Sequence, residues 1–186
     1  DDDAVAAGYS FQIDLNTSFT GEDSLDISLD AGTGGTEGIA EFDKNSLGAG
    51  LRVDGVAYTF PIGEKTTLMV GADSDGSALF TGACVYGGPG DMLDDCGAVN
   101  AGITGGGTAV SASYDFGGGF TAAVGAQTEN TSVFTEESAD SFALNAAYIQ
   151  DNYGLSLTYA VIEAVDANDA LTDEEDKFTA VNAYYT

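Results

Sequence analysis

The chain has 186 residues, the length of one ordinary domain, and a formal net charge of -27, because 31 Asp and Glu residues outnumber four Lys and Arg residues. Such a field repels phosphate backbones and anionic headgroups, so the composition disfavours nucleic-acid binding and membrane attachment through a basic face. The absence of histidine excludes Ser-His-Asp and Cys-His pairs, and the abundant carboxylates single out no glycosidase pair, so we expect no enzymatic activity.

Alternation of apolar and polar residues predicts β-strands along the whole chain. The clearest pair is TAVSASYDFGGGFTAAVGAQT, residues 108–128, where two alternating arms meet at three glycines that tolerate the positive φ angles of a tight turn. The alternation slips near Gly55, which predicts a β-bulge. In chain order the predicted strands are residues 8–19, 24–31, 47–60, 66–72, 108–116, 120–128, 141–150, 153–162 and 177–185.

The connections between these strands alternate in length. The short ones are residues 20–23, 61–65, 117–119 and 151–152, and the long ones are 32–46, 73–107, 129–140 and 163–176. If the strands run up and down in order, every short turn falls at one end and every long loop at the other, as in outer-membrane barrels. We therefore predict an all-β fold, an up-and-down antiparallel transmembrane β-barrel of which this chain supplies about nine strands.

The two faces of the predicted strands differ in chemistry. One face is apolar with aromatic residues near the strand ends, as an interfacial girdle requires, and the other is small and polar. The polar face lines water in a barrel, whereas in a soluble sheet it would be the ordinary solvent side. Carboxylates in a lumen would favour cations over anions. The predicted pore-lining residues are Asp14, Asp26, Asp30, Arg52, Ser111, Ser113 and Asn145.

The only two cysteines, Cys84 and Cys96, lie twelve positions apart in a stretch rich in Gly and Asp. This spacing predicts a disulfide and an oxidising compartment. Free thiols are the alternative, and a metal site that includes Asp94 and Asp95 is a weaker one, because it would have two thiolates and no histidine.

The loop that carries the cysteines, residues 73–107, is too long for a simple connection, which favours a functional role. It either folds inward and narrows the pore, with Asp91, Asp94 and Asp95 at the constriction, or forms an outer cap.

A short part of this loop resembles the beginning of a calcium-binding loop. Asp73, Asp75 and Gly76 resemble part of such a loop, but Cys84 stands where the bidentate glutamate belongs. Asp73 and Asp75 are therefore weak candidates for Ca²⁺ ligands, and we expect no other cofactor.

Three blocks of the chain carry a family resemblance: SFQIDLNTSFTGEDSLDISLDAG from Ser10, VAYTFPIGEKTTLMVG from Val56 and ACVYGGPGDMLDDCG from Ala83. They resemble the barrel region of cyanobacterial outer-membrane porins that carry a surface-layer-homology domain, which are similar to the carbohydrate-selective porin group. The resemblance implies a passive, water-filled channel for inorganic ions and small hydrophilic solutes. It also implies a bacterial outer-membrane location, contact with outer-membrane lipid and a homotrimer.

We expect residues 1–186 to be part of a single barrel domain. Members of the resembled group carry a wall-binding domain before the barrel and further strands after it, and we expect both to be missing here, since single-chain bacterial barrels use even strand numbers. The alternative from another functional class is a secreted, acidic, β-rich adhesin or surface-layer component that binds calcium.

Overall fold

The computed structural model describes residues 10–32, 48–84, 107–128, 139–165 and 171–186. These residues form strands and connections without a helix, so none of them belongs to a helix long and apolar enough to cross a membrane. The strands are β1 (Ser10–Thr17), β2 (Ser24–Gly32), β3 (Gly48–Ile62), β4 (Thr66–Ala72), β5 (Thr108–Gly117), β6 (Phe120–Thr128), β7 (Asp140–Ile149), β8 (Tyr153–Val165) and β9 (Leu171–Tyr185).

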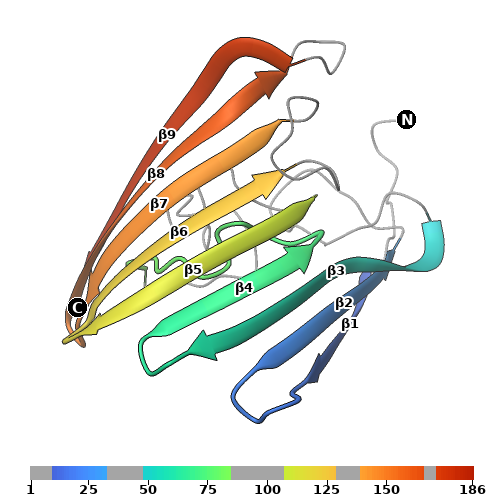
Figure 1. Ribbon diagram of the computed structural model, residues 1–186, viewed down its shortest axis with the longest axis horizontal. Coiled ribbons are helices and arrows are strands. Elements are labelled where there is room, and N and C mark those ends of the chain that lie inside the picture. Colours follow the sequence, from blue (N-terminus) through green and yellow to red (C-terminus); the bar gives the residue numbers. More distant parts are fainter. Residues whose placement is uncertain (1–9, 33–47, 85–106, 129–138, 166–170) are drawn as a thin grey trace, which may run out of the picture.

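All nine strands belong to one antiparallel sheet in which each strand pairs with the next one along the chain. This confirms the predicted all-β, up-and-down arrangement. The sheet is curled, as Figure 1 shows, and it is open. Its two edges are β1 and β9, which do not pair with each other in the described part of the chain.

The hairpin of β5 and β6 has the predicted turn. Gly117, Gly118 and Gly119 have φ angles of 86°, 65° and 90°. Residues with a side chain rarely adopt these angles, so the three glycines allow the chain to reverse here. The register that follows places Ala112 opposite Val124, which brings the apolar residues of both strands to one face.

The connections alternate between the two ends of the sheet as predicted, and three of the four predicted long ones exceed every connection at the other end in length. In an up-and-down sheet alternate connections share an end, and the four short ones lie together toward the lower left of Figure 1. They are residues 18–23, 63–65, 118–119 and 150–152. The other four connections begin at the opposite end, and most of their residues lie outside the described ranges. Residues 33–47, 73–107 and 129–139 form the three long ones. The fourth spans only residues 166–170, because β8 ends later and β9 begins earlier than predicted, so the predicted long loop 163–176 is wrong.

The predicted bulge is present in β3. Gly55 pairs with Ser28 and Val53 pairs with Leu29, so Asp54 is an extra residue on this strand. A bulge shifts the alternation by one residue, which is the slip seen in the sequence.

The start of β9 was predicted too late. The acidic residues 173–176 were assigned to a loop, but β9 begins at Leu171, and its first half pairs with β8 through Glu163 opposite Glu175 and Ile162 opposite Asp176. Glu175 and Asp176 are exposed, so their charges stay in water while the backbone completes the ladder. Ladder hydrogen bonds require no apolar side chain, and a pattern of side chains therefore misses such a segment.

The packing of the sheet is inverted relative to a soluble protein. In the described residues the buried apolar side chains are nine alanines and Met69, while many large apolar side chains are exposed. We call the face that carries Phe120, Val124 and Leu144 the outer face, and the opposite face, which carries Ala123 and Asn145, the inner face.

Candidate functional site

The seven predicted pore-lining residues all come to the inner face. Strand register establishes this, because residues that pair directly across strands point to the same side of a sheet. Asp30 pairs with Arg52, so the one arginine of the chain lies beside a carboxylate on a neighbouring strand and not across a lumen from it. The others follow from the pairs Asp14–Ser28, Asp26–Ala57, Thr67–Ser113, Met69–Ser111 and Ala123–Asn145.

These seven residues differ in their access to water. Asp14, Asp26 and Arg52 are exposed and Ser113 is half-buried, whereas Asp30, Ser111 and Asn145 are buried, with Ser111 5% and Asn145 3% exposed. Among these seven residues, Asp14, Asp26 and Arg52 face open water in the described structure.

Hydrogen bonds hold the exposed carboxylates of β1 and β2 in place. Ser28 Oγ donates to Asp14 Oδ1 at 2.7 Å, and Ser24 Oγ donates to Asp26 Oδ2 at 2.6 Å. Asn16 Nδ2 donates to the other oxygen of Asp26. The donors are neutral, so this end of the inner face keeps its negative charge.

Residues 73–84, the first part of the long connection after β4, cross the inner face. Figure 1 shows this green segment running behind β5 and β6. Its backbone N–H groups donate to side-chain oxygens on three successive strands, which fixes its path across the sheet. The bonds run from Gly76 to Gln127 of β6 (3.1 Å), from Thr81 to Asn145 of β7 (2.9 Å) and from Ala83 to Ser156 of β8 (2.9 Å).

Small residues let this segment lie close to the sheet. Phe80 packs against Ala143 and Ala160, two fully buried residues of the inner face. A Cβ atom added to Gly76 would lie 3.1 Å from the carbonyl oxygen of Ala126, so a larger residue would push the segment away. Residues 73–84 therefore lie against the inner face.

Cys84, the last described residue of the segment, is disulfide-bonded. The sequence contains one other cysteine, Cys96. Cys96 and the predicted constriction residues Asp91, Asp94 and Asp95 lie outside the described residues.

A cavity of about 550 Å³ opens where the segment leaves β4. Its acidic lining residues are Asp26, Asp54, Asp73 and Asp75. Asp54 is the extra residue of the β3 bulge. It was not predicted as a site residue, and its one trace in the sequence is the slip of alternation near Gly55. The weak calcium candidates Asp73 and Asp75 both lie here, but no three Asp, Glu or Cys side chains of the described residues come together as a metal site.

Aromatic rings form a belt on the outer face near the short turns. Phe120 and Tyr148 stack with their centroids 4.1 Å apart, and Tyr148 contacts Tyr153 at 5.8 Å. Tyr114 and Phe116 pack edge to face at 4.7 Å. A second group continues the belt over β3, through the pairs Tyr58–Phe60 at 5.3 Å and Phe19–Tyr58 at 6.1 Å.

The turn between β1 and β2 is built on the Asp23 carboxylate. Ser18 Oγ donates to it at 2.6 Å, Tyr58 Oη at 2.7 Å and the backbone N–H of Thr20 at 2.8 Å. These donors, Ser18 first, hold the pKa of Asp23 well below its usual range. The charged carboxylate therefore ties the turn to β3.

Comparison of the chain with family models, curated proteins and solved structures found no match.

Proposed function

We propose that this chain forms part of the wall of an outer-membrane porin. The porin would allow passive diffusion of inorganic ions and small hydrophilic solutes through a water-filled pore that favours cations. This proposal agrees with the resemblance of three sequence blocks to cyanobacterial outer-membrane porins. The observation that carries it is the inverted packing of the sheet.

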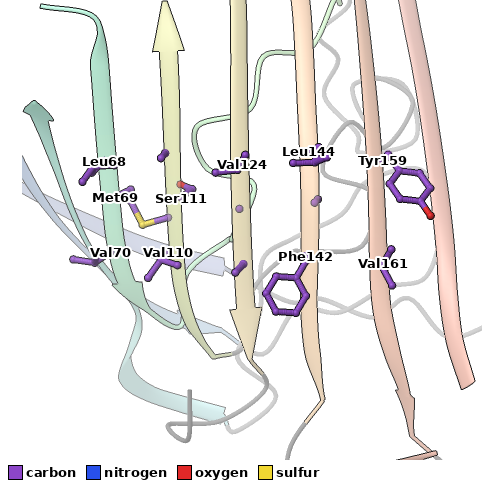
Figure 2. A pocket seen from close by; sticks show the side chains of 14 residues that line it. Leu68, Met69, Val70, Val110, Ser111, Val124, Phe142, Leu144, Tyr159 and Val161 are labelled. Carbon is purple, nitrogen blue, oxygen red and sulfur yellow. The ribbon is translucent and has the colours of Figure 1, made fainter. Parts of the chain in front are cut away.

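Large apolar side chains cover the outer face, and no other described part of the chain forms a layer over them. Figure 2 shows several of them on neighbouring strands, among them Val124, Leu144 and Tyr159. Leu144 is 58% exposed and Val181 65% exposed, and Leu155 and Leu157 lie exposed between them on β8. Exposed apolar surface costs about 25 cal/mol per Å² in water, and a continuous patch of this kind marks contact with lipid or another protein. The aromatic belt at one end of the face suits a membrane interface.

The inner face supports the preference for cations. The exposed carboxylates of Asp14 and Asp26 point to this side, and Arg52 is the one basic residue among the predicted pore-lining positions. Rings or rows of carboxylates in a pore raise the local concentration of cations. The segment 73–84 lies on the same side and would narrow the pore.

In a membrane the edges of β1 and β9 must pair with further strands, because open edges leave backbone groups unpaired in lipid. In an up-and-down sheet of nine strands the first and last strands run in the same direction. An entirely antiparallel barrel therefore takes an odd number of further strands between β9 and β1.

The test is conductance of the full-length protein in a planar bilayer with a salt gradient. We expect discrete channels whose reversal potential has the sign of a channel that conducts cations in preference to anions. The double substitution of Asp14→Asn and Asp26→Asn would shift this potential toward zero. Asp151→Asn, an exposed residue of a short turn, is the matched control and leaves it unchanged.

A preference for anions in the unmodified channel would refute the proposed selectivity. A protein that stays monodisperse in buffer without detergent, and whose gel mobility does not change on heating, would refute the porin and favour the secreted adhesin or surface-layer component.

A further inference from the structure

Asn145 pairs with the backbone of the crossing segment in both directions. Its Oδ1 accepts a hydrogen bond from the N–H of Thr81 at 2.9 Å, and its Nδ2 donates to the carbonyl oxygen of Thr81 at 3.2 Å. Nδ2 also donates to Thr158 Oγ1 at 2.8 Å, which orients the amide from the neighbouring strand β8. The amide thus reproduces the paired donor and acceptor of a β-ladder.

Two further side chains of the inner face hold the segment on either side of this contact. Gln127 of β6 accepts from Gly76, and Ser156 of β8 accepts from Ala83. Gln127, Asn145 and Ser156 are all buried, so water competes little for their oxygens. Three contacts on three adjacent strands fix both the position and the direction of the segment.

We propose that Asn145, together with Gln127 and Ser156, positions the 73–84 segment on the wall and thereby sets the free cross-section of the pore. The first half of this inference, the anchoring, stands on the hydrogen bonds alone. The second half, the cross-section, rests on the proposed porin function. Asn145 is therefore a positioning residue and not one that lines open water.

The anchoring is tested by hydrogen exchange of the backbone amides in the full-length protein. Ser156→Ala removes one acceptor with little change in shape, and we expect the amide of Ala83 to exchange about tenfold faster, since one neutral hydrogen bond is worth about that factor. Asn145→Ala removes the central contact, and the amide of Thr81 then exchanges faster by at least as much.

Ser111→Ala is the matched control. Ser111 is a buried serine of the same face whose Oγ has no hydrogen-bond partner in the described structure, so its removal leaves the amides of Thr81 and Ala83 protected as before. Unchanged exchange of the Ala83 amide in Ser156→Ala would overturn the anchoring.

The pore cross-section is tested by single-channel conductance and by the size of the largest neutral polymer that enters. We expect Asn145→Ala to raise both, and Asn152→Ala, at an exposed residue of a short turn, to change neither. Faster exchange with unchanged conductance would overturn the second half of the inference. If the unmodified protein forms no channel, the proposed function fails, while the exchange rates still decide the anchoring.

Discussion

Replacing Gly119 with alanine tests whether the two neighbouring short turns support each other. The Cβ of the alanine would lie 2.2 Å from the carbonyl oxygen of Ile149 and 2.3 Å from Nε2 of Gln150. Gly118, in the same turn, also has a positive φ angle, but a Cβ there meets nothing within 4 Å. Gly118→Ala is therefore a matched control that carries the backbone cost without the collision.

The structure gives the size of the difference. Both variants pay about 1 kcal/mol for a side chain at positive φ. The collision in Gly119→Ala forces the turns apart and breaks the bond from the N–H of Ile149 to Gly119 O, 2.9 Å, and the bond from Gln150 Nε2 to Gly118 O, 2.8 Å. Each contributes about 1 kcal/mol net, so we expect losses of about 3 kcal/mol for Gly119→Ala and about 1 kcal/mol for Gly118→Ala.

The assay is denaturant unfolding of the protein in lipid or detergent. The chain contains no tryptophan, so far-ultraviolet circular dichroism and the shift in gel mobility follow the folded fraction. Equal losses of unfolding free energy in Gly118→Ala and Gly119→Ala would refute the reasoning, because the backbone cost alone would then account for both.

Four more substitutions, two of them in one double-mutant cycle, test other parts of the structure. Hydrogen bonds lower the pKa of Asp23, so its contribution to the free energy of unfolding is present above pH 4 and is lost as the pH falls through the lowered value. Measured from pH 7 to pH 2, the free energy of unfolding should therefore fall less steeply with acid in Asp23→Asn than in the unmodified protein. Phe120→Ala removes the ring that stacks on Tyr148, and a double-mutant cycle with Tyr148→Ala should give a coupling energy of about 1 kcal/mol. A coupling energy of zero would show that the two rings do not stabilise each other. Gly76→Val should displace the crossing segment and speed its proteolysis, while the circular dichroism of the sheet stays the same. Unchanged proteolysis would contradict the close approach of Gly76 to the backbone of Ala126.

The strands were predictable because their signals are local. Alternation in the hairpin of residues 108–128 fixes which side chains share a face, and three consecutive glycines fix where the chain reverses. The same rule placed Asp14 and Asn145 on one face, although they lie on strands far apart in the sheet. A slip of one residue in the register of a strand would have moved all of that strand's side chains to the other face.

The burial of Asn145 was not predictable in the same way. A polar residue on this face of β7 could be exposed to water or covered by protein, and local alternation does not distinguish the two. Asn145 is covered by Thr81, which lies 64 residues earlier in the chain. No local pattern states which loop crosses which strand. The contact is also between a side chain and the backbone, so the identity of Thr81 leaves no signal in the sequence.

The position of the segment explains why the inner face is divided by charge. Beneath the segment, β6 to β8 carry small or neutral side chains such as Ala143, Asn145 and Ser156, while the exposed acids Asp14 and Asp26 lie on β1 and β2. Covering a carboxylate without a paired charge costs several kcal/mol, whereas a buried amide or hydroxyl is compensated by one or two hydrogen bonds. The backbone of the segment therefore lies over neutral side chains, while Asp14 and Asp26 stay in contact with water.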